Sequence, residues 1–442
     1  MTKLKVGMIS LGCNKNRVDS ETALGLLREH GYELTNDPAQ ADVLMVNTCG
    51  FIASAKEESI DAILDMARYK QIGKCRVLVV TGCLAQRYEK DLMQEIPEID
   101  LLMGVNQYQQ LPDALEKALG GVRKTYCMDD HTYYAHDRVL TTPSYTAYTR
   151  IGEGCSNCCT YCAIPSIRGP FRSRDEESIV EEAKTLANGG VKELVLIAQD
   201  VSSYGIDIYG EYRLAHLLDL LCEIDGIEWI RLLYCYPDKI TDELIDTMAS
   251  QPKVLHYIDL PLQHADDKIL KAMNRHSTAE ETREVIRKLR ERMPDIAIRT
   301  TFIVGFPGEG DDEFETLAEF VNEEEFERLG CFEYSPQEGT PAAKMENQVD
   351  DDVKSRRAEV IMQDQYEIMT EKNNNMIGKT LRVLTESYDD YTDSYSGRSY
   401  MDAPDIDGKI IFTSPDFIKE GEFVDVEILG VNEYDLLGRT VK

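Results

Sequence analysis

The sequence lacks any apolar run long enough to cross a membrane, so no transmembrane helix and no membrane partner are expected. The apolar stretch near the start ends at Gly12-Cys13 and is too short for a secretion signal. Cysteines are too sparse for a disulfide scaffold, with twelve among 442 residues. These absences predict a cytoplasmic protein whose thiols stay reduced and free to bind metal.

Basic residues are also scarce. The chain has 48 Lys and Arg against 80 Asp and Glu, a formal net charge of −32. A protein that mainly grips nucleic acid phosphates usually presents a basic face, so tRNA is not an expected partner. The charge favours attraction to a basic partner, although on its own it is equally consistent with plain solubility.

Four cysteines lie within eight positions: Cys155, Cys158, Cys159 and Cys162. Three of them form the spacing C-x-x-x-C-x-x-C, which suits an iron–sulfur cluster with one iron left open. A structural zinc site would need a fourth ligand, and Cys158 would have to point the same way as its neighbour Cys159. The open-iron interpretation is therefore favoured over a zinc knuckle or a disulfide.

Residues 4–120 alternate strand-like runs at 6–10, 43–47 and 77–80 with amphipathic helical segments. This alternation predicts a doubly wound parallel sheet with helices on both faces. Cys13, Cys49 and Cys83 each follow one of these strands, and the carboxyl ends of parallel strands share one edge. Each could be a buried structural thiol, but together they favour a metal site. Cys75 precedes its strand and is excluded.

A linker is predicted at residues 121–145, followed by a second β/α region at residues 146–376 that ends in a connecting helix. Six strands are expected, at 147–151, 193–198, 229–233, 257–260, 297–303 and 329–332. Six β/α units predict an open, partial TIM-type barrel with its site at the carboxyl ends of the strands. Cys155, Gln199, Asp200 and His264 would share that mouth.

Other polar residues of this region have two interpretations each. Arg168, Arg172 and Arg174 either meet a ligand or substrate carboxylate or are solvated surface arginines. His264 is at least as well explained by a structural, hydrogen-bonded role as by a functional one. Gly189 and Gly190 are better explained as a helix cap than as a cofactor contact.

Residues 377–442 contain short strand-like runs punctuated by glycines, which predicts a small OB-like β-barrel. The segment has seven Lys and Arg against fourteen Asp and Glu, a net charge of −7. An acidic barrel is better suited to a basic polypeptide than to RNA. Its acidic residues and five tyrosines are candidates for docking: Tyr388, Tyr391, Tyr395, Tyr400 and Tyr434.

The cysteine motif, with Tyr161 before its last cysteine, resembles that of the radical S-adenosylmethionine (SAM) enzymes. Ser10-Leu11-Gly12-Cys13, Asn47-Thr48-Cys49 and Thr81-Gly82-Cys83 resemble the N-terminal domain of the methylthiotransferases. The tail resembles their TRAM domain. The resemblance covers essentially the whole chain and rests on three ordered domains with three further cysteines.

This resemblance implies SAM and two 4Fe–4S clusters as cofactors. Cys155, Cys159 and Cys162 would hold the cluster that cleaves SAM to a 5′-deoxyadenosyl radical, and the radical would abstract hydrogen from an unactivated carbon. The other cluster, whose open iron could carry the sulfur, would be held by Cys13, Cys49 and Cys83. Contacts to the cofactor would come from Tyr161, Gln199 and Asp200. A second SAM would supply the methyl group, and a separate protein would donate electrons.

Two branches of the methylthiotransferases differ in substrate. One modifies an adenosine of tRNA, and the other modifies the β-carbon of an aspartate in small-subunit ribosomal protein twelve. The segments Ser10-Leu11-Gly12-Cys13 and 398–408 resemble the second branch, and the acidic tail agrees because ribosomal proteins are basic. A non-enzymatic iron–sulfur scaffold is the alternative from another class, and it predicts no SAM cleavage.

Overall fold

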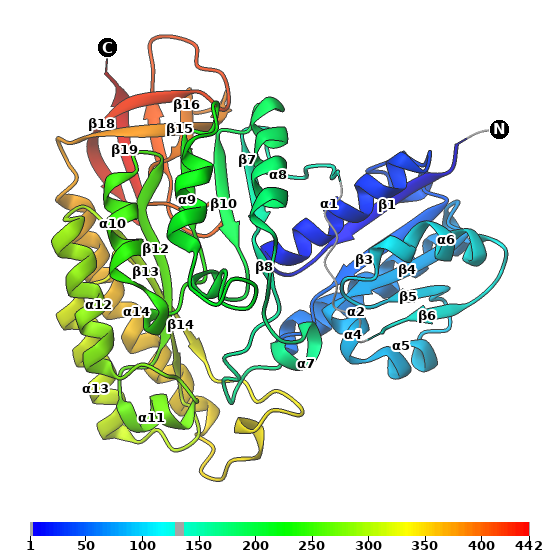
Figure 1. The fold of residues 1–442 in the computed structure, drawn as a ribbon, viewed down its shortest axis with the longest axis horizontal. Coiled ribbons are helices and arrows are strands. Elements are labelled where there is room, and N and C mark those ends of the chain that lie inside the picture. Colours follow the sequence, from blue (N-terminus) through cyan, green and yellow to red (C-terminus); the bar gives the residue numbers. More distant parts are fainter. Residues whose placement is uncertain (1–2, 129–136, 442) are drawn as a thin grey trace.

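The computed structural model describes residues 3–128 and 137–441 and divides the chain into three domains (Figure 1). An N-terminal α/β domain lies beside a larger central α/β domain, and a small all-β domain covers one end of the central domain. Within the described residues, no helix is long and apolar enough to span a membrane.

The N-terminal domain is built on a six-stranded parallel sheet in the order β2-β1-β3-β4-β5-β6. Its strands are β1 (Lys5–Ser10), β2 (Glu33–Leu34), β3 (Val43–Thr48), β4 (Val77–Gly82), β5 (Leu101–Met103) and β6 (Lys124–Tyr126). The three predicted strands are confirmed. The sheet also includes β6, which lies beyond residue 120 in the predicted linker. The edge strands β2 and β6 have only two and three residues, too few to give an apolar pattern in the sequence. Residues 129–136 of that linker lie outside the described part.

Helices cover both faces of this sheet, which confirms the doubly wound arrangement. They are α1 (Asn14–Glu29), α2 (Ala53–Ala67), α3 (Tyr69–Ile72), α4 (Cys83–Arg87), α5 (Glu89–Glu95) and α6 (Leu111–Leu119), with 3-10 turns at Pro38–Gln40 and Tyr108–Gln110. Along β3, Val43 and Met45 pack toward α1 and α6, whereas Leu44 and Val46 pack toward α2 and α5. A strand buried on both faces needs a continuous apolar run, as the sequence shows here.

The central domain is an open six-stranded parallel sheet in the order β7-β10-β11-β12-β13-β14, the partial barrel that the sequence predicts. Its strands are β7 (Thr146–Arg150), β10 (Glu193–Ile197), β11 (Trp229–Leu232), β12 (Val254–Gln263), β13 (Ala297–Val304) and β14 (Arg328–Glu333). All six predicted strands are present. A two-stranded ribbon pairs β8 (Gly152–Glu153) with β9 (Arg172–Ser173) beside the first strand.

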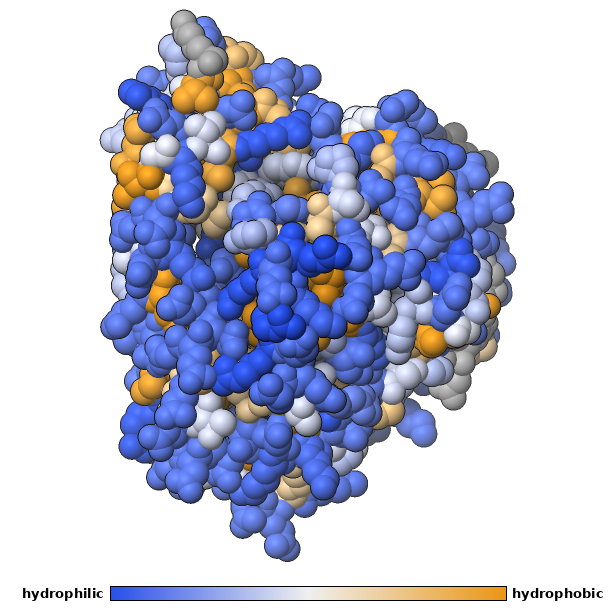
Figure 2. All heavy atoms as spheres, turned by 60° about the vertical axis from the view of Figure 1, so that its left-hand side comes forward, coloured by the Kyte–Doolittle hydropathy of each residue, from blue (hydrophilic) through white to orange (hydrophobic). Residues whose placement is uncertain are grey.

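The helices of the central domain lie around its sheet, with α7 (Ile164–Arg168) at the boundary to the N-terminal domain (Figure 1). The others are α8 (Glu176–Asn188), α9 (Leu214–Cys222), α10 (Asp242–Ser250), α11 (Asp267–Ala272), α12 (Ala279–Arg292), α13 (Asp311–Glu324) and α14 (Asp351–Asn374), with 3-10 turns at Val201–Ser203, Pro237–Lys239 and Ala342–Lys344. Gly189 is the C-cap residue of α8 and Gly190 has a φ of 99°, so both glycines end that helix as predicted. Figure 2 shows a mainly hydrophilic face of the molecule. Surface ion pairs such as Arg292–Asp246 join neighbouring helices.

The C-terminal domain is a closed five-stranded barrel in the order β15-β16-β17-β19-β18, which confirms the predicted small β-barrel. Its strands are β15 (Thr380–Asp389), β16 (Ser394–Arg398), β17 (Ile410–Thr413), β18 (Phe423–Asn432) and β19 (Asp435–Thr440). The barrel packs on the amino-terminal end of the central sheet, where Glu193 begins β10 and Trp229 begins β11. This is the end opposite to the predicted site.

A buried ionic cluster fixes this contact. The carboxylate of Glu193 accepts hydrogen bonds from Arg398 Nη2 at 2.6 Å and from Arg231 Nε at 2.9 Å, and all three side chains are at most 2% exposed. Burial alone would raise the pKa of Glu193, but Arg398 and Arg231 outweigh it and lower the pKa to about 2. The glutamate therefore stays charged and holds the two domains together.

Part of segment 398–408 also takes part in the contact between the C-terminal barrel and the central domain. Arg328 binds Asp402 at 2.5 Å, Tyr257 donates to Asp407 at 2.8 Å, and the Tyr400 hydroxyl donates to the Asp295 carbonyl at 2.9 Å. Among the tail residues expected to dock a partner, Tyr400 is thus engaged inside the molecule.

Tyr395 is buried within the barrel, at 6% exposure, so it too is withdrawn from docking. Tyr388, Tyr391 and Tyr434 remain exposed. The docking candidates are therefore reduced to these three tyrosines and the acidic residues around them.

Candidate functional site

The central cysteines lie in the loop between β8 and α7. Cys155 and Cys159 are buried and Cys162 is half-buried. Burial, together with the charges of Cys159 and Cys155, raises the pKa of Cys162 to about 12, so the three thiols share one electrostatic environment. Cys158 is exposed and has a left-handed φ of 52°. The loop therefore brings together the three cysteines of the predicted spacing and leaves Cys158 in solvent.

Hydrogen-bond donors surround these sulfurs. The backbone N–H of Ile164 donates to Cys162 Sγ at 3.4 Å, and Asn157 Nδ2 donates to Cys155 Sγ at 3.5 Å. Arg275 Nη1 lies 4.0 Å from Cys159 Sγ. Donors of this kind favour the thiolate over the thiol, which is the form that binds iron.

The predicted cofactor contacts occupy the same mouth. Tyr161 is near Cys159 and packs with Phe306 and Tyr334. Gln199 follows β10, and its Nε2 donates to Glu153 Oε1 at 3.1 Å. Tyr161 lies within the cysteine loop, and Gln199 contacts Glu153 just before that loop.

Asp200 is engaged by protein groups. It pairs with Lys239, accepts from Asn157 Nδ2 at 2.8 Å and accepts from Ser203 at 2.7 Å. Its role within the protein is to fix Asn157 against Cys155. Asn157, Lys239 and Arg275 were not among the predicted residues. Lys239 and Arg275 lie far from the motif in sequence, and Asn157 lies within it but depends on the distant Asp200 and Lys239.

His264 follows β12 and is buried, with its Nε2 3.3 Å from Glu309 Oε2. The backbone N–H of Asp266 lies 3.0 Å from its Nδ1. Both ring nitrogens face protein groups, which agrees with the structural role.

The N-terminal cysteines follow three adjacent parallel strands, as predicted. Cys13 precedes α1, Cys49 follows β3, and Cys83 begins α4. Their thiols interact electrostatically with one another: Cys13 and Cys49 both raise the pKa of Cys83. The largest effect there is burial, and the result is a pKa of about 12. Cys75 lies before β4, buried and apart from the three.

Two glycines allow the loops to approach. Gly12 has φ 85°, and a Cβ there would lie 2.8 Å from the Cβ of Cys49. Gly82 has φ 96°, and a Cβ there would lie 2.3 Å from Asn47 Oδ1. Both positions have a left-handed backbone and no room for a side chain. This explains why a glycine directly precedes Cys13 and Cys83.

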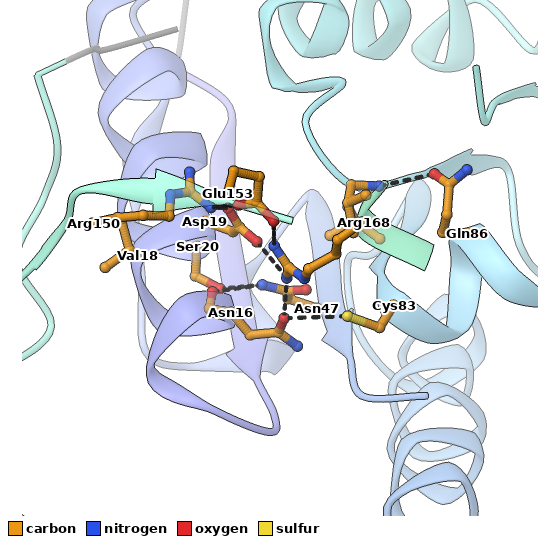
Figure 3. Close-up of polar contacts among 12 residues, drawn as sticks. Asn16, Val18, Asp19, Ser20, Asn47, Cys83, Gln86, Arg150, Glu153 and Arg168 are labelled. Atoms are coloured by element: carbon orange, nitrogen blue, oxygen red, sulfur yellow. Dashed lines mark hydrogen bonds and ion pairs between the residues drawn. The ribbon is translucent and has the colours of Figure 1, made fainter. Parts of the chain in front are cut away.

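A buried polar network joins the N-terminal domain to the cysteine loop (Figure 3). Arg168 donates to Asn16 Oδ1 at 2.7 Å, to Asp19 Oδ2 at 2.9 Å and to Glu153 Oε1 at 3.0 Å. Arg150 bonds the second oxygens of Asp19 and Glu153 at 2.6 and 2.7 Å. Arg168 is therefore a buried interdomain residue, which neither of its two sequence interpretations anticipates.

The other two arginines of that group differ from Arg168. Arg174 is also buried and pairs with Glu182 at 2.6 Å, so it stabilises the central domain. Arg172 is half-buried and donates to the carbonyl of Pro170 at 2.7 Å. Neither contact points to a ligand.

The network brings the two sets of cysteines close together. Cys83 packs in one small apolar cluster with Val105, Ala163 and Ile167, and Ala163 directly follows Cys162. Arg168, six residues after Cys162, also hydrogen-bonds the Cys83 thiol. Cys83 of the N-terminal set thus packs, across the domain boundary, against the segment that directly follows the central set.

The donor set on each side of the boundary consists of thiols, the ligands that iron–sulfur clusters take. Within residues 3–128 and 137–441, no three Cys, His, Asp or Glu side chains are arranged to hold one metal ion. A four-iron cluster is larger than an ion and takes its thiolates at separate corners. Three thiols on each side of the boundary, with N–H donors to the central sulfurs, fit such a group.

Known protein families match three successive parts of the chain. Family profiles described as "Uncharacterized protein family UPF0004", "Radical SAM superfamily" and "TRAM domain" match residues 5–104, 149–321 and 377–441. Two relatives are named ribosomal protein uS12 methylthiotransferase RimO. The one from Lachnoclostridium phytofermentans is 51% identical, over 98% of this chain and 99% of its own. The one from Desulforamulus reducens is 52% identical, over 98% of both.

Solved structures share the fold at much lower identity. The radical SAM methyltransferase TsrM from Kitasatospora setae, solved with cobalamin and a 4Fe–4S cluster, has a TM-score of 0.57 at 14% identity. The match covers 76% of this chain and 77% of TsrM. The cobalamin-dependent radical SAM enzyme OxsB has a TM-score of 0.51 at 14% identity, covering 83% of this chain and 58% of OxsB.

Proposed function

Because the chain belongs to the family of ribosomal protein uS12 methylthiotransferases, we propose that it adds a methylthio group to uS12, at the β-carbon of an aspartate. The observation that carries the proposal is the approach of two cysteine sets across one domain boundary. A transfer of this kind needs two kinds of chemistry, radical formation and sulfur delivery, at one place. The same two sites would also serve a tRNA-modifying methylthiotransferase, and the 51% and 52% identity to uS12 methylthiotransferases is what favours the protein substrate.

Each cysteine set has a distinct part in this proposal. Cys155, Cys159 and Cys162 would hold the cluster that binds SAM, and a second cluster would be held by Cys13, Cys49 and Cys83. When bound, these groups supply the radical and sulfur chemistry that an unactivated C–H bond requires. A separate electron donor is part of the proposal.

The chain itself supplies position and exclusion of water. Asn157 and the N–H of Ile164 hold two of the central sulfurs, and Asp200 fixes Asn157. Tyr161 forms an aromatic wall with Phe306 beside the loop, and Gln199 and Tyr161 would contact SAM. These contacts keep the mouth dry and preorganised, which protects a reactive intermediate from side reactions.

Arg168 and Glu153 would set the distance between the two cysteine sets. Their contacts with Asp19 and Arg150 are buried and mutually neutralising, so the domain boundary is rigid at the reacting end. A substrate carbon placed between the sets would therefore meet both in one fixed arrangement.

Docking of uS12 is proposed at the exposed tip of the C-terminal barrel. The tip between β15 and β16 carries Asp389, Asp390 and Asp393 together with Tyr388 and Tyr391, of which Tyr391 is 97% exposed. Acidic residues beside exposed aromatic rings suit a basic, partly apolar polypeptide, and charge complementarity would speed its association.

The test is mass spectrometry of reaction products. Recombinant uS12 and a tRNA anticodon stem-loop would each be incubated anaerobically with reconstituted protein, dithionite and SAM. A methylthio mass gain on the uS12 aspartate is expected, and Cys155→Ala should abolish it while Cys158→Ala, the matched control, retains it. Gain on the RNA alone would move the assignment to the tRNA branch. No gain, with no 5′-deoxyadenosine formed, would leave the scaffold function instead.

A further inference from the structure

Seven consecutive residues after β10 form an exposed surface with a large apolar share. Residues 206–212 lie between the 3-10 turn Val201–Ser203 and α9, and all seven are exposed. Four large side chains among them are 38–48% exposed: Ile206, Ile208, Tyr209 and Tyr212. Single exposed apolar residues are common on soluble proteins, whereas four within one short loop are typical of a surface that another molecule covers. These four residues, with Asp207 and Glu211, form what we call the 206–212 patch.

Hydrogen bonds fix the backbone beneath this patch. The Asp207 carboxylate accepts from the Ser173 N–H at 2.9 Å and from the Ser173 hydroxyl at 2.6 Å, and that hydroxyl accepts from the Gly205 N–H at 2.9 Å. Gly205 has a φ of 94°, and a Cβ there would lie 2.8 Å from the Cβ of Arg213. The Arg213 guanidinium packs over the Tyr209 ring at 4.6 Å. The apolar side chains are therefore displayed on a preorganised loop, so a partner would lose little affinity to ordering it.

The patch lies at the same end of the central sheet as the cysteine loop. It follows the carboxyl end of β10, and Ser173 belongs to β9, which pairs with β8 just before that loop. Asp200 adds a link, because it accepts hydrogen bonds from Ser203 before the patch and from Asn157 inside the cysteine loop. A protein bound on the patch would therefore lie beside the cysteine loop.

The barrel lies at the other end of the sheet (Figure 1). It packs where Glu193 begins β10, and the five residues of β10 extend about 17 Å. A substrate held by the barrel tip alone would thus be attached a full strand length away from the cysteines. A second contact at the carboxyl end would orient the substrate there, and two linked contacts bind more tightly than either one.

The chemistry of the patch resembles that of the barrel tip. Residues 206–212 include two acidic residues and no lysine or arginine, and the next residue, Arg213, is paired with Glu176 and Glu211. The barrel tip likewise combines exposed tyrosines with aspartates. Exposed aromatic rings beside acidic groups suit a polypeptide that is basic and partly apolar, and they disfavour RNA.

We propose that the 206–212 patch is a docking surface for uS12 that holds the substrate protein beside the cysteine loop, while the barrel tip makes a separate contact with it. The proposal rests on the function proposed above and adds the surface that brings the target aspartate to the site. Tyr209 also supports the loop through Arg213, so Ile208 and Tyr212 are the residues that test the surface alone.

The test measures the affinity of recombinant uS12 for the reconstituted full-length protein by surface plasmon resonance. Ile208→Ser and Tyr212→Ser are combined in one variant. We expect its dissociation constant for uS12 to rise about tenfold to hundredfold, as for the loss of central interface anchors, while 5′-deoxyadenosine formation without uS12 stays at the wild-type rate. The matched control combines Ile72→Ser and Val122→Ser, two residues of the N-terminal domain that are 73% and 50% exposed, and should bind uS12 as the wild type does.

Glu211→Lys is a second variant, which keeps the apolar side chains and reverses one charge. It should also bind uS12 more weakly, and its difference from the wild type should shrink as salt is added. Wild-type affinity in both variants would overturn the proposal, and so would an equal loss in the control pair.

Two other outcomes identify a different error. Analytical ultracentrifugation could show that Ile208→Ser with Tyr212→Ser abolishes self-association and leaves the affinity for uS12 unchanged. That result would overturn the proposal and assign the patch to a second copy of the chain. A wild type that adds no methylthio group to uS12 refutes the proposed function, and the docking surface with it.

Discussion

Replacing Glu193 with glutamine should loosen the C-terminal barrel from the central domain. The pKa of Glu193 falls from its ordinary value of 4.5 to about 2, because Arg398 and Arg231 outweigh the effect of burial. A tenfold change in proton affinity corresponds to about 1.4 kcal/mol, so this lowering corresponds to about 3 kcal/mol of stability. Glu193→Gln removes the charge at constant shape and leaves two buried arginines poorly paired. We expect the free energy of unfolding at pH 7 to fall by about 3 kcal/mol.

The chain provides its own probe for this measurement. Trp229, the single tryptophan, pairs with Glu193 across β10 and β11 and lies 4.7 Å from the Phe423 ring of the barrel. Its fluorescence during urea unfolding therefore reports on this contact. The matched control is Glu284→Gln, an exposed carboxylate of α12 that pairs with Arg287 and should leave the unfolding midpoint unchanged.

The dependence on pH gives a second check. Because the pKa of Glu193 is lower in the folded state, its contribution is fully present above pH 4.5 and is lost as the pH falls toward 2. The wild type and Glu193→Gln should therefore converge in stability over that range. A difference below about 1 kcal/mol at pH 7, or one that does not narrow in acid, would refute the reasoning.

Three further predictions concern the cysteine sets and their link. Cys155→Ala should abolish 5′-deoxyadenosine formation from SAM, whereas Cys158→Ala should retain it, as liquid chromatography would show; equal loss in both variants would contradict the ligand assignment. Cys83→Ala should lower the iron content of reconstituted protein by about half and Cys75→Ala should not, and unchanged iron in both would argue against a second cluster. Arg168→Met removes a buried cation shared by two carboxylates and should destabilise the contact between the N-terminal and central domains by about 3–5 kcal/mol. Limited proteolysis between these domains should become faster. An unchanged rate of proteolysis would show that other contacts hold the two domains together.

The cysteine sites could be predicted because their geometry follows from topology. Once residues 43–48 and 77–82 are taken as neighbouring parallel strands, Cys49 and Cys83 must reach the same sheet edge. The central motif has short spacing and needs no long-range information. Local pattern was sufficient in both cases.

The contacts between domains could not be predicted in the same way. Arg168, Asp19 and Glu153 meet only after two domains have docked, and a single charged residue gives no periodic signal of that. The same holds for Tyr400, which the pattern placed on the barrel surface although it bonds the neighbouring domain. One signal was present: Asp19 lies four and seven residues before Ala23 and Leu26, on the helix face that the apolar pattern assigns to the interior, and it is fully buried.

The long helix α14 has a consequence for how separable the three domains are. Its 24 residues extend about 36 Å. The ion pair of Arg357 with Glu309 holds its first half near the mouth, and its other end leads to the first strand of the barrel. The barrel is thereby attached through α14 as well as through the Glu193 cluster. It covers the amino-terminal end of the central sheet. The barrel is therefore part of the packing of the central domain and is not a separable module. A chimera with the barrel of another protein would need matching arginine and acidic residues on both the barrel and the central domain. Without them, the amino-terminal end of the central sheet would be exposed to water.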